Sequence, residues 1–178
     1  QISFEARKSE YVDRKSGVSA RMSITAYENL ISTAERRMLR RGDTKTTVRL
    51  SDFMGVIPAI TGKIELVYEG EQEGADNVAQ ILIEDGVKTL FNQYFPEIKK
   101  LERKDAETPY DSIITWFFES EGIELLDDLS DAEYHKALDG VPPLDHLVRK
   151  HLPDLDERAV PFVKELVLWG LEGFQKLS

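Results

Sequence analysis

Apolar residues recur at intervals of four and three residues between residues 20 and 38, the spacing that places side chains on one face of an α-helix. The apolar positions of this repeat are Ala20, Ile24, Tyr27, Ile31, Ala34 and Met38. Ser19 is a candidate N-cap, the arginines of residues 36–41 favour the C-terminal end of the helix dipole, and Gly42 is a suitable stop. Thr25 with Glu28 would form a capping box and offers a rival start for the same helix.

The next signals are shorter. Residues 46–50 predict at most a short extended β segment. Ser51 is expected to cap a further helix, which Pro58 and Gly62 must kink or break. One side of this helix would carry Phe53, Val56, Ile60, Ile64 and Val67.

Residues 69–74 are acidic and rich in glycine, which is typical of a loop. We therefore expect a boundary here, with one domain at residues 1–70 and a second domain at residues 75–178.

The second part of the chain predicts helices alone, so the expected fold class is all-α. A helix over residues 75–95 ends at Pro96, and the charged residues 98–108 predict a linker. The last helix, residues 157–177, is apolar around much of its circumference, so it is either a buried central helix or half of a protein interface. Three shorter helices are predicted between them. Apolar residues after Pro109 indicate the first, and a capping box of Ser130 and Glu133 with a stop at Gly140 indicates the second. Leu144, Leu147 and Val148 before Pro153 indicate the third.

Charge is distributed unevenly along the 178 residues. Residues 1–50 hold eleven Lys and Arg against six Asp and Glu, whereas residues 51–178 hold twelve against 27, and the net charge of the chain is −10. The basic first part suggests contact with an anion or an acidic surface, and the acidic remainder argues against a general nucleic-acid binder.

The sequence contains no cysteine, which fits a reducing compartment, and we expect a cytoplasmic protein. No apolar run approaches the roughly 18 residues that a membrane span requires. The chain begins at Gln1 within a predicted helix, so we expect a segment upstream of it.

The segment that carries chemistry is Ser16-Gly17-Val18-Ser19-Ala20-Arg21, directly before the long amphipathic helix. Glycine permits an unusual turn, and the amides at a helix start together with a nearby arginine form an electropositive spot suited to a phosphate. The fork of donors on arginine stays charged and can hold phosphate oxygens at two points. From the residues alone, an arginine in a first helical turn is usually an ordinary surface side chain.

Four features follow one another in the chain: this segment, the helix ending in arginine-rich turns at Gly42, the stretch Val48-Arg49-Leu50-Ser51-Asp52-Phe53, and Ile57-Pro58. Together they resemble the lid domain of MoxR-type and magnesium-chelatase-type AAA+ ATPases over about residues 1–68. In that family a Gly-x-Ser-x-Arg segment opens the sensor 2 helix, and its arginine touches the γ-phosphate of ATP on the neighbouring core domain. The resemblance implies that Arg21 is the sensor 2 arginine and that Ser19 and Gly17 shape its approach. It also implies an AAA+ lid-type helical bundle followed by a C-terminal helical extension.

The sequence lacks the motifs of a complete ATPase. The spacing from Gly55 to Gly62-Lys63 differs from a P-loop, and Ile64 stands where the hydroxyl residue belongs. We therefore expect that the chain alone neither binds ATP tightly nor hydrolyses it, and that ATP and magnesium are cofactors of a parent protein. His146 and His151 are five residues apart, a poor match to two metal ligands on one helix face, so no metal site is expected.

The resemblance implies that the parent protein is an ATPase with an upstream AAA+ core domain, and that neighbouring subunits form a ring that remodels a client protein or helps insert a metal. Coupling of ATP hydrolysis to lid motion would be the role of Arg21. Two other readings stay open: a stand-alone helical adaptor without nucleotide, docking through its apolar last helix, and a small acidic hydrolase.

Overall fold

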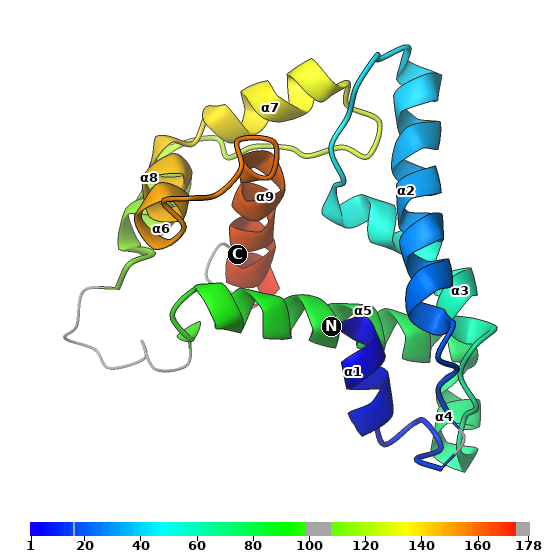
Figure 1. Ribbon diagram of the computed structural model, residues 1–178. Helices are drawn as coiled ribbons and strands as arrows, with labels where there is room; N and C mark the ends of the chain where they lie inside the picture. Colours follow the sequence, from blue (N-terminus) through cyan, green and yellow to red (C-terminus); the bar gives the residue numbers. More distant parts are fainter. Residues whose placement is uncertain (16, 99–107, 174–178) are drawn as a thin grey trace. The chain divides into compact units, whose positions relative to one another are not determined.

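The computed structural model describes residues 1–15, 17–98 and 108–173, and regular structure in these ranges is helical (Figure 1). The described residues form no strand, which confirms the all-α prediction. Residues 46–49 have no regular structure, so the short β segment allowed there is not formed. The elements are α1 (Ile2–Lys8), α2 (Met22–Arg41), the 3-10 helix η1 (Leu50–Val56), α3 (Ile57–Thr61), α4 (Tyr68–Glu73), α5 (Ala75–Tyr94), α6 (Asp111–Glu119), α7 (Asp131–Asp139), α8 (Pro142–His151) and α9 (Val160–Gly173).

The chain folds into two compact units, each made of two segments. Unit 1 comprises Gln1–Arg36 and Ser51–Leu90, and unit 2 comprises Arg37–Leu50 and Phe91–Ser178. Helices α2 and α5 contribute residues to both units. The division of the sequence into domains at residues 1–70 and 75–178 stays a prediction.

Unit 1 packs α1, α3, α4 and η1 with the larger parts of α2 and α5. Gly55 of η1 lies directly against α2, because a Cβ at this position would be 2.0 Å from Oγ1 of Thr33. Thr89 of α5 donates a hydrogen bond to the carboxylate of Glu5 in α1 at 3.2 Å. The buried apolar side chains of unit 1 include Ala6, Met22, Val56, Ile60, Val78 and Leu82.

Residues 63–67 run antiparallel to residues 11–13 and 17–19 within unit 1. Isolated bridges join Val12 to Leu66 and Val18 to Ile64. The expected continuation of the Ser51 helix through Ile64 and Val67 is therefore wrong, because α3 ends at Thr61 and the chain then pairs with a segment far away in the sequence.

Unit 2 is built around α9, which contacts α7 and α8, while α8 also contacts α6. Gly170 allows the close approach of Phe91, since a Cβ there would be 2.8 Å from the Phe91 ring. The reading of the last helix as a buried helix is confirmed. Its buried apolar side chains are Val160, Val163, Leu166, Val167, Leu168 and Leu171.

Several helix ends follow the expected signals. Ser130 accepts a hydrogen bond from the backbone of Glu133, whose carboxylate accepts one from the backbone of Ser130, so the predicted capping box opens α7. Gly42 follows α2 with a φ of 71°, a left-handed conformation that glycine adopts without strain. The linker predicted at residues 98–108 lies almost wholly outside the described residues.

Two local expectations are corrected. The acidic segment predicted as a loop forms α4, which ends at Gly74 with a φ of 94°. The apolar face of α2 is buried only in part: Ala34 is buried, whereas Ile24 and Tyr27 are exposed. Helical periodicity was thus a correct guide to secondary structure in α2 but not to burial along its whole length.

Candidate functional site

The turn before α2 is held by backbone hydrogen bonds on both sides of Gly17. The amide of Gly17 donates to the carbonyl oxygen of Asp13 at 2.9 Å, and the carbonyl oxygen of Gly17 accepts from the amide of Glu65, also at 2.9 Å. The amide of Ser19 donates to the carbonyl oxygen of Lys63 at 2.9 Å. These bonds fasten the segment that leads into α2 to the antiparallel residues 63–67.

Gly17 is required by space. A Cβ on this buried residue would be 1.9 Å from the carbonyl oxygen of Asp13 and 2.7 Å from Cγ1 of Val12. Since the first of these neighbours is backbone, no side-chain rotation could relieve the overlap. Any larger residue at position 17 would therefore displace the turn that carries Ser19 and Arg21.

Ser19 makes the side-chain and backbone hydrogen bonds expected of the N-cap, although α2 itself begins at Met22. Its Oγ accepts a hydrogen bond from the amide of Arg21 at 3.3 Å, and its carbonyl oxygen accepts one from the amide of Met22, where α2 begins. The rival start at Thr25 is wrong, because the Thr25 amide donates to the carbonyl oxygen of Arg21 inside the helix.

The guanidinium of Arg21 is exposed at the beginning of α2. Within residues 1–15, 17–98 and 108–173 it makes no ion pair or hydrogen bond, and the first turn of α2 contains no acidic residue. The positive end of the helix dipole adds to its charge. Gly17, Ser19 and Arg21 therefore form one fixed turn that presents a free cation, an arrangement suited to an anion.

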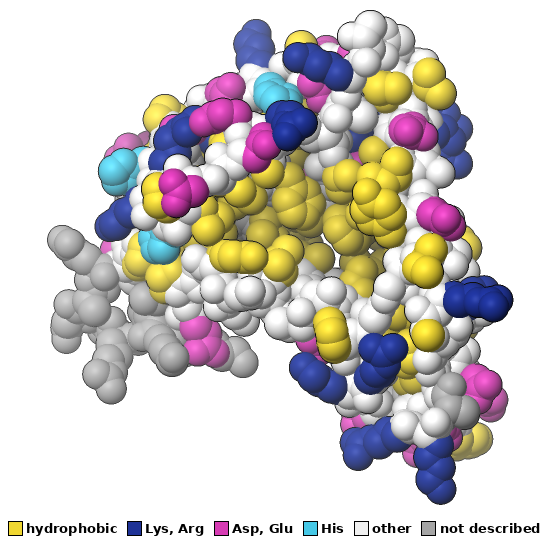
Figure 2. Space-filling view, viewed as in Figure 1, with side chains coloured by type: hydrophobic (Ala, Val, Ile, Leu, Met, Phe, Trp, Pro, Cys, Tyr) yellow, Lys and Arg dark blue, Asp and Glu magenta, His cyan; other side chains and the backbone are white. Residues whose placement is uncertain are grey.

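A second cationic feature of unit 1 escaped sequence reasoning. Arg7, at the C-terminal end of α1, lines a pocket of about 180 Å³ with Arg14 and Lys15 of the following turn. Figure 2 shows Lys and Arg side chains gathered over α1 and the turn after it. The charge count of residues 1–50 indicated a basic region, but it could not show which side chains meet.

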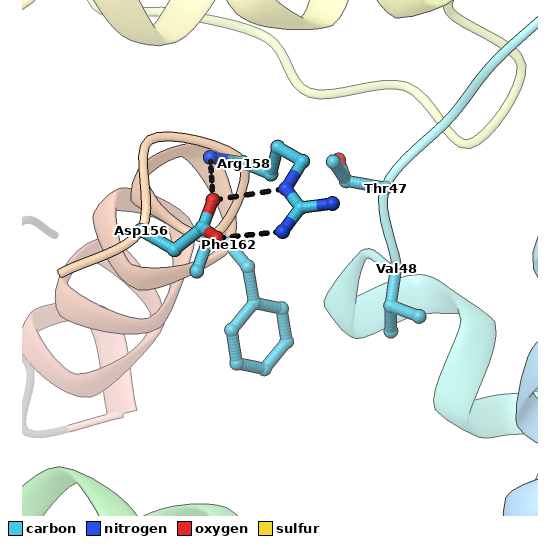
Figure 3. A pocket seen from close by; sticks show the side chains of 6 residues that line it. Thr47, Val48, Asp156, Arg158 and Phe162 are labelled. Carbon is cyan, nitrogen blue, oxygen red and sulfur yellow. Dashed lines mark hydrogen bonds and ion pairs between the residues drawn. The ribbon is translucent and has the colours of Figure 1, made fainter.

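Unit 2 has a more apolar pocket of about 410 Å³, lined by the residues labelled in Figure 3 and by Ala159. Its cation is already neutralised, because Nη2 of Arg158 lies 2.7 Å from Oδ2 of Asp156 and Nε lies 3.0 Å from Oδ1. This ion pair lowers the pKa of Asp156 below its usual range. Arg158 is thus committed to its neighbour rather than to a ligand.

Two of the three histidines make local contacts. His135 lies 3.7 Å from a carboxylate oxygen of Asp131 on the same helix, and His151 contacts the carbonyl oxygen of Leu147 and the ring of Phe95. No cluster of three or more metal-ligating side chains occurs in the part of the chain that the structure describes. In that same part, no helix combines the length and apolar character needed to cross a membrane.

Comparison with known proteins yields no relative: no protein-family model, curated protein or solved structure matches this chain. The chemistry of the site must therefore be argued from its own residues.

Proposed function

We propose that the chain is the lid and C-terminal helical region of a MoxR- or magnesium-chelatase-like AAA+ ATPase, in which Arg21 contacts the γ-phosphate of ATP held by an upstream core domain. The observation that carries the proposal is the exposed and unpaired guanidinium of Arg21 on a turn fixed by Gly17 and Ser19. A rigid turn favours such a role, because an arginine that reads a phosphate must be aimed before the phosphate arrives.

The proposed mechanism is a two-state coupling. While ATP is bound, its γ-phosphate accepts hydrogen bonds from Arg21 and draws the lid toward the core domain. Hydrolysis removes that contact, and the lid rotates relative to the core and to the next subunit of a ring. ATP and magnesium would be bound by the core domain, and the remodelling of a client protein or the activation of a metal chelatase would follow from lid motion.

The hydrogen bonds of unit 1 support the proposed coupling between Arg21 and the motion of the lid. The hydrogen bonds of Gly17, Ser19 and their partners in residues 63–67 lie within unit 1, so a force on Arg21 would be passed to that unit through α2 and the paired segments. In this proposal the C-terminal helices pack in the ring or dock a partner.

The decisive experiment is Arg21→Ala in the protein that joins this chain to its ATPase core. ATP turnover should fall by about 10- to 100-fold, the scale of losing a hydrogen bond to a charged group, which is worth about 1.5–3 kcal/mol. Arg36→Ala, which removes another exposed arginine of α2, is the matched control and should leave turnover unchanged. Equal turnover in the Arg21 and Arg36 variants would remove the sensor assignment. The coding sequence upstream of Gln1 provides a simpler test, since the proposal requires a P-loop and a Walker B strand there.

The alternative of a stand-alone helical adaptor predicted docking through the apolar last helix. Most apolar side chains of α9 are buried, and Phe162 and Trp169 are half-buried, so this helix offers an adaptor little apolar surface. Exposed apolar residues such as Phe118 of α6 are available, but they have no accompanying feature that selects a partner. The free cation at a fixed turn therefore favours the ATPase lid.

A further inference from the structure

The pocket between the end of α1 and the following turn brings together three cations from two short stretches of chain. Arg7 belongs to the last turn of α1, and Arg14 and Lys15 belong to the turn that precedes Gly17. All three side chains are exposed. Among the described residues none of the three forms an ion pair through its side chain.

Hydrogen bonds of Asp13 hold the described residues of the turn that carries two of these cations. Oδ1 of Asp13 accepts a hydrogen bond from the amide of Lys15 at 2.7 Å, and the carbonyl oxygen of Asp13 accepts one from the amide of Gly17. The amide of Asp13 in turn donates to the carbonyl oxygen of Glu65 at 2.9 Å. The chain's own hydrogen bonds therefore position Asp13 and Gly17 on either side of Arg14 and Lys15.

The charge balance of the pocket favours a multiply charged anion. Asp13 also lines it, so three cations face one carboxylate, and that carboxylate is engaged with the Lys15 amide. Uncompensated like charges repel one another in the folded state, and an anion that binds between them relieves the repulsion. Two arginine forks and one ammonium group are donors of the kind that phosphate oxygens accept.

The size of the pocket limits the ligand further. Its volume of about 180 Å³ is below the roughly 300–1,000 Å³ of sites that enclose a drug-sized molecule. A volume of this size suits a tetrahedral oxyanion better than a nucleoside. Gly17 of the turn before α2 also lines the pocket, but Arg21 does not, so the cations of this site differ from the one proposed to read the γ-phosphate.

We propose that Arg7, Arg14 and Lys15 form a binding site for a phosphate group, either as free orthophosphate or as the terminal phosphate of a small molecule. This inference does not depend on the ATPase assignment, because its cations are Arg7, Arg14 and Lys15 and not Arg21.

The test is isothermal titration calorimetry of the 178-residue chain with inorganic phosphate, at low ionic strength and about pH 8, where phosphate carries close to two negative charges. We expect saturable binding with one site per chain. The variant Arg7→Gln/Arg14→Gln/Lys15→Gln should bind at least about tenfold more weakly. Absence of saturable binding to the unmodified chain would overturn the proposal.

The matched control is Arg36→Gln/Arg40→Gln/Lys45→Gln, which removes two arginines and one lysine from exposed positions elsewhere. Its phosphate affinity should stay within about twofold of the unmodified chain, since exposed charges at a distance are screened. An equal loss in both triple variants would mean attraction to net charge only, and the site would be refuted. Far-UV circular dichroism and melting curves verify that both variants fold, and Lys15→Gln alone provides a milder variant, expected to weaken binding in the same direction.

Further arms identify the source of the phosphate group and separate this site from Arg21. If ATP binds the unmodified chain and binds the Arg7→Gln/Arg14→Gln/Lys15→Gln variant more weakly, a terminal phosphate is supported as the ligand. If adenosine competes with phosphate, the size argument is contradicted. Arg21→Ala should retain phosphate binding. If Arg21→Ala abolished it and the pocket variant did not, the anion would belong to the turn before α2 and this inference would fail.

Discussion

Arg21 in unit 1 and Arg49 in unit 2 show the two opposite uses that this chain makes of arginine. Arg21 is exposed and presents its guanidinium to solvent from a fixed turn. Arg49 is only 1% exposed, and its guanidinium carbon lies 4.2 Å from the centre of the Tyr134 ring. The first is available to a ligand, whereas the second is surrounded by its own protein.

The environment of Arg49 joins a loop to two helices. Nη1 of Arg49 donates to the carbonyl oxygen of Leu129 at 2.8 Å, just before α7. Glu165 of α9 accepts hydrogen bonds from the hydroxyl of Tyr134 and from the amide of Leu50, each at 2.8 Å. Burial raises the pKa of Tyr134, and the Glu165 carboxylate raises it further.

The comparison shows that the surroundings, more than the residue type, separate an arginine that stabilises from one that can bind. A buried guanidinium loses its hydration and must recover it from neighbours, so its removal leaves those neighbours unpaired. Truncation of an exposed arginine changes the free energy of unfolding little, because its guanidinium is hydrated in the folded and the unfolded state. Four substitutions or conditions test this difference, and they follow from the largest expected effect to the smallest.

Arg49→Ala should lower the free energy of unfolding by about 3–5 kcal/mol, the scale of removing one partner from a buried charged network. Urea denaturation followed by tryptophan fluorescence is the measurement, because both tryptophans, Trp116 and Trp169, belong to unit 2. Arg49→Met should restore part of the loss, since it fills the space with an apolar chain. A loss below about 1 kcal/mol for Arg49→Ala would show that the network contributes little to stability.

Gly17→Ala should destabilise unit 1 by about 3 kcal/mol, the upper end of the usual cost of overpacking, because the new Cβ would meet a backbone oxygen. Gly62→Ala is the control: its Cβ would lie 3.3 Å from the carbonyl oxygen of Pro58, a contact that small shifts relieve. Amide hydrogen exchange of residues 11–19 and 63–67 is the readout. Unchanged protection in Gly17→Ala would contradict the tight turn.

Local patterns were sufficient to predict most helices. The period of four and three residues marked α2, and the capping box at Ser130 marked the start of α7. They failed at residues 62–67, where the chain pairs with residues 11–19, because a pairing partner some fifty residues away leaves no trace in a local window. They also failed at α4. Its acidic and glycine residues are typical of a loop, but the chain forms a short α-helix there.

The candidate site divides in the same way. The order Gly17, Ser19, Arg21 before a long helix was visible in the sequence, and the structure adds the backbone bonds that fix it. The basic pocket could not be predicted, because Arg7 and Arg14 are brought together by the turn between them. The burial of Arg49 could not be predicted either. Arginine is rarely buried, and the residues next to Arg49 give no sign that it contacts the Tyr134 ring.

Lowering the pH should reduce the stability of unit 2 by less than the two substitutions above. The reduction would involve Lys164, which is 3% exposed. Its ammonium lies 2.8 Å from Asp139 and 3.0 Å from Asp145, and the hydrogen bond to Asp145, with a smaller contribution from Arg149, lowers the pKa of Asp145. A carboxyl whose folded pKa is depressed stabilises the fold above its unfolded pKa of about 3.9, and this stabilisation is lost as the pH falls through the folded pKa. Because Asp145 is partly exposed, solvent screening reduces the effect.

Melting temperatures between pH 6 and pH 2 measure this contribution. Lys164→Met keeps the buried volume and removes the cation, so its melting temperature should fall less steeply over this range than that of the unmodified chain. Other depressed carboxyls, such as Glu157 beside Arg149, leave a residual slope in both proteins. Parallel curves for the two proteins would show that Lys164 does not set the acid response.

Arg21→Ala should have the smallest effect on stability, within about 0.5 kcal/mol, because it truncates an exposed side chain that makes no ion pair with the described residues. Urea denaturation and hydrogen exchange should therefore be nearly identical to those of the unmodified chain. The same substitution is the one expected to lower ATP turnover in the protein joined to its core domain, so stability and function would separate at this residue. A loss of stability as large as that of Arg49→Ala would reverse the comparison, since Arg21 would then be part of the fold's own framework and unavailable to a phosphate.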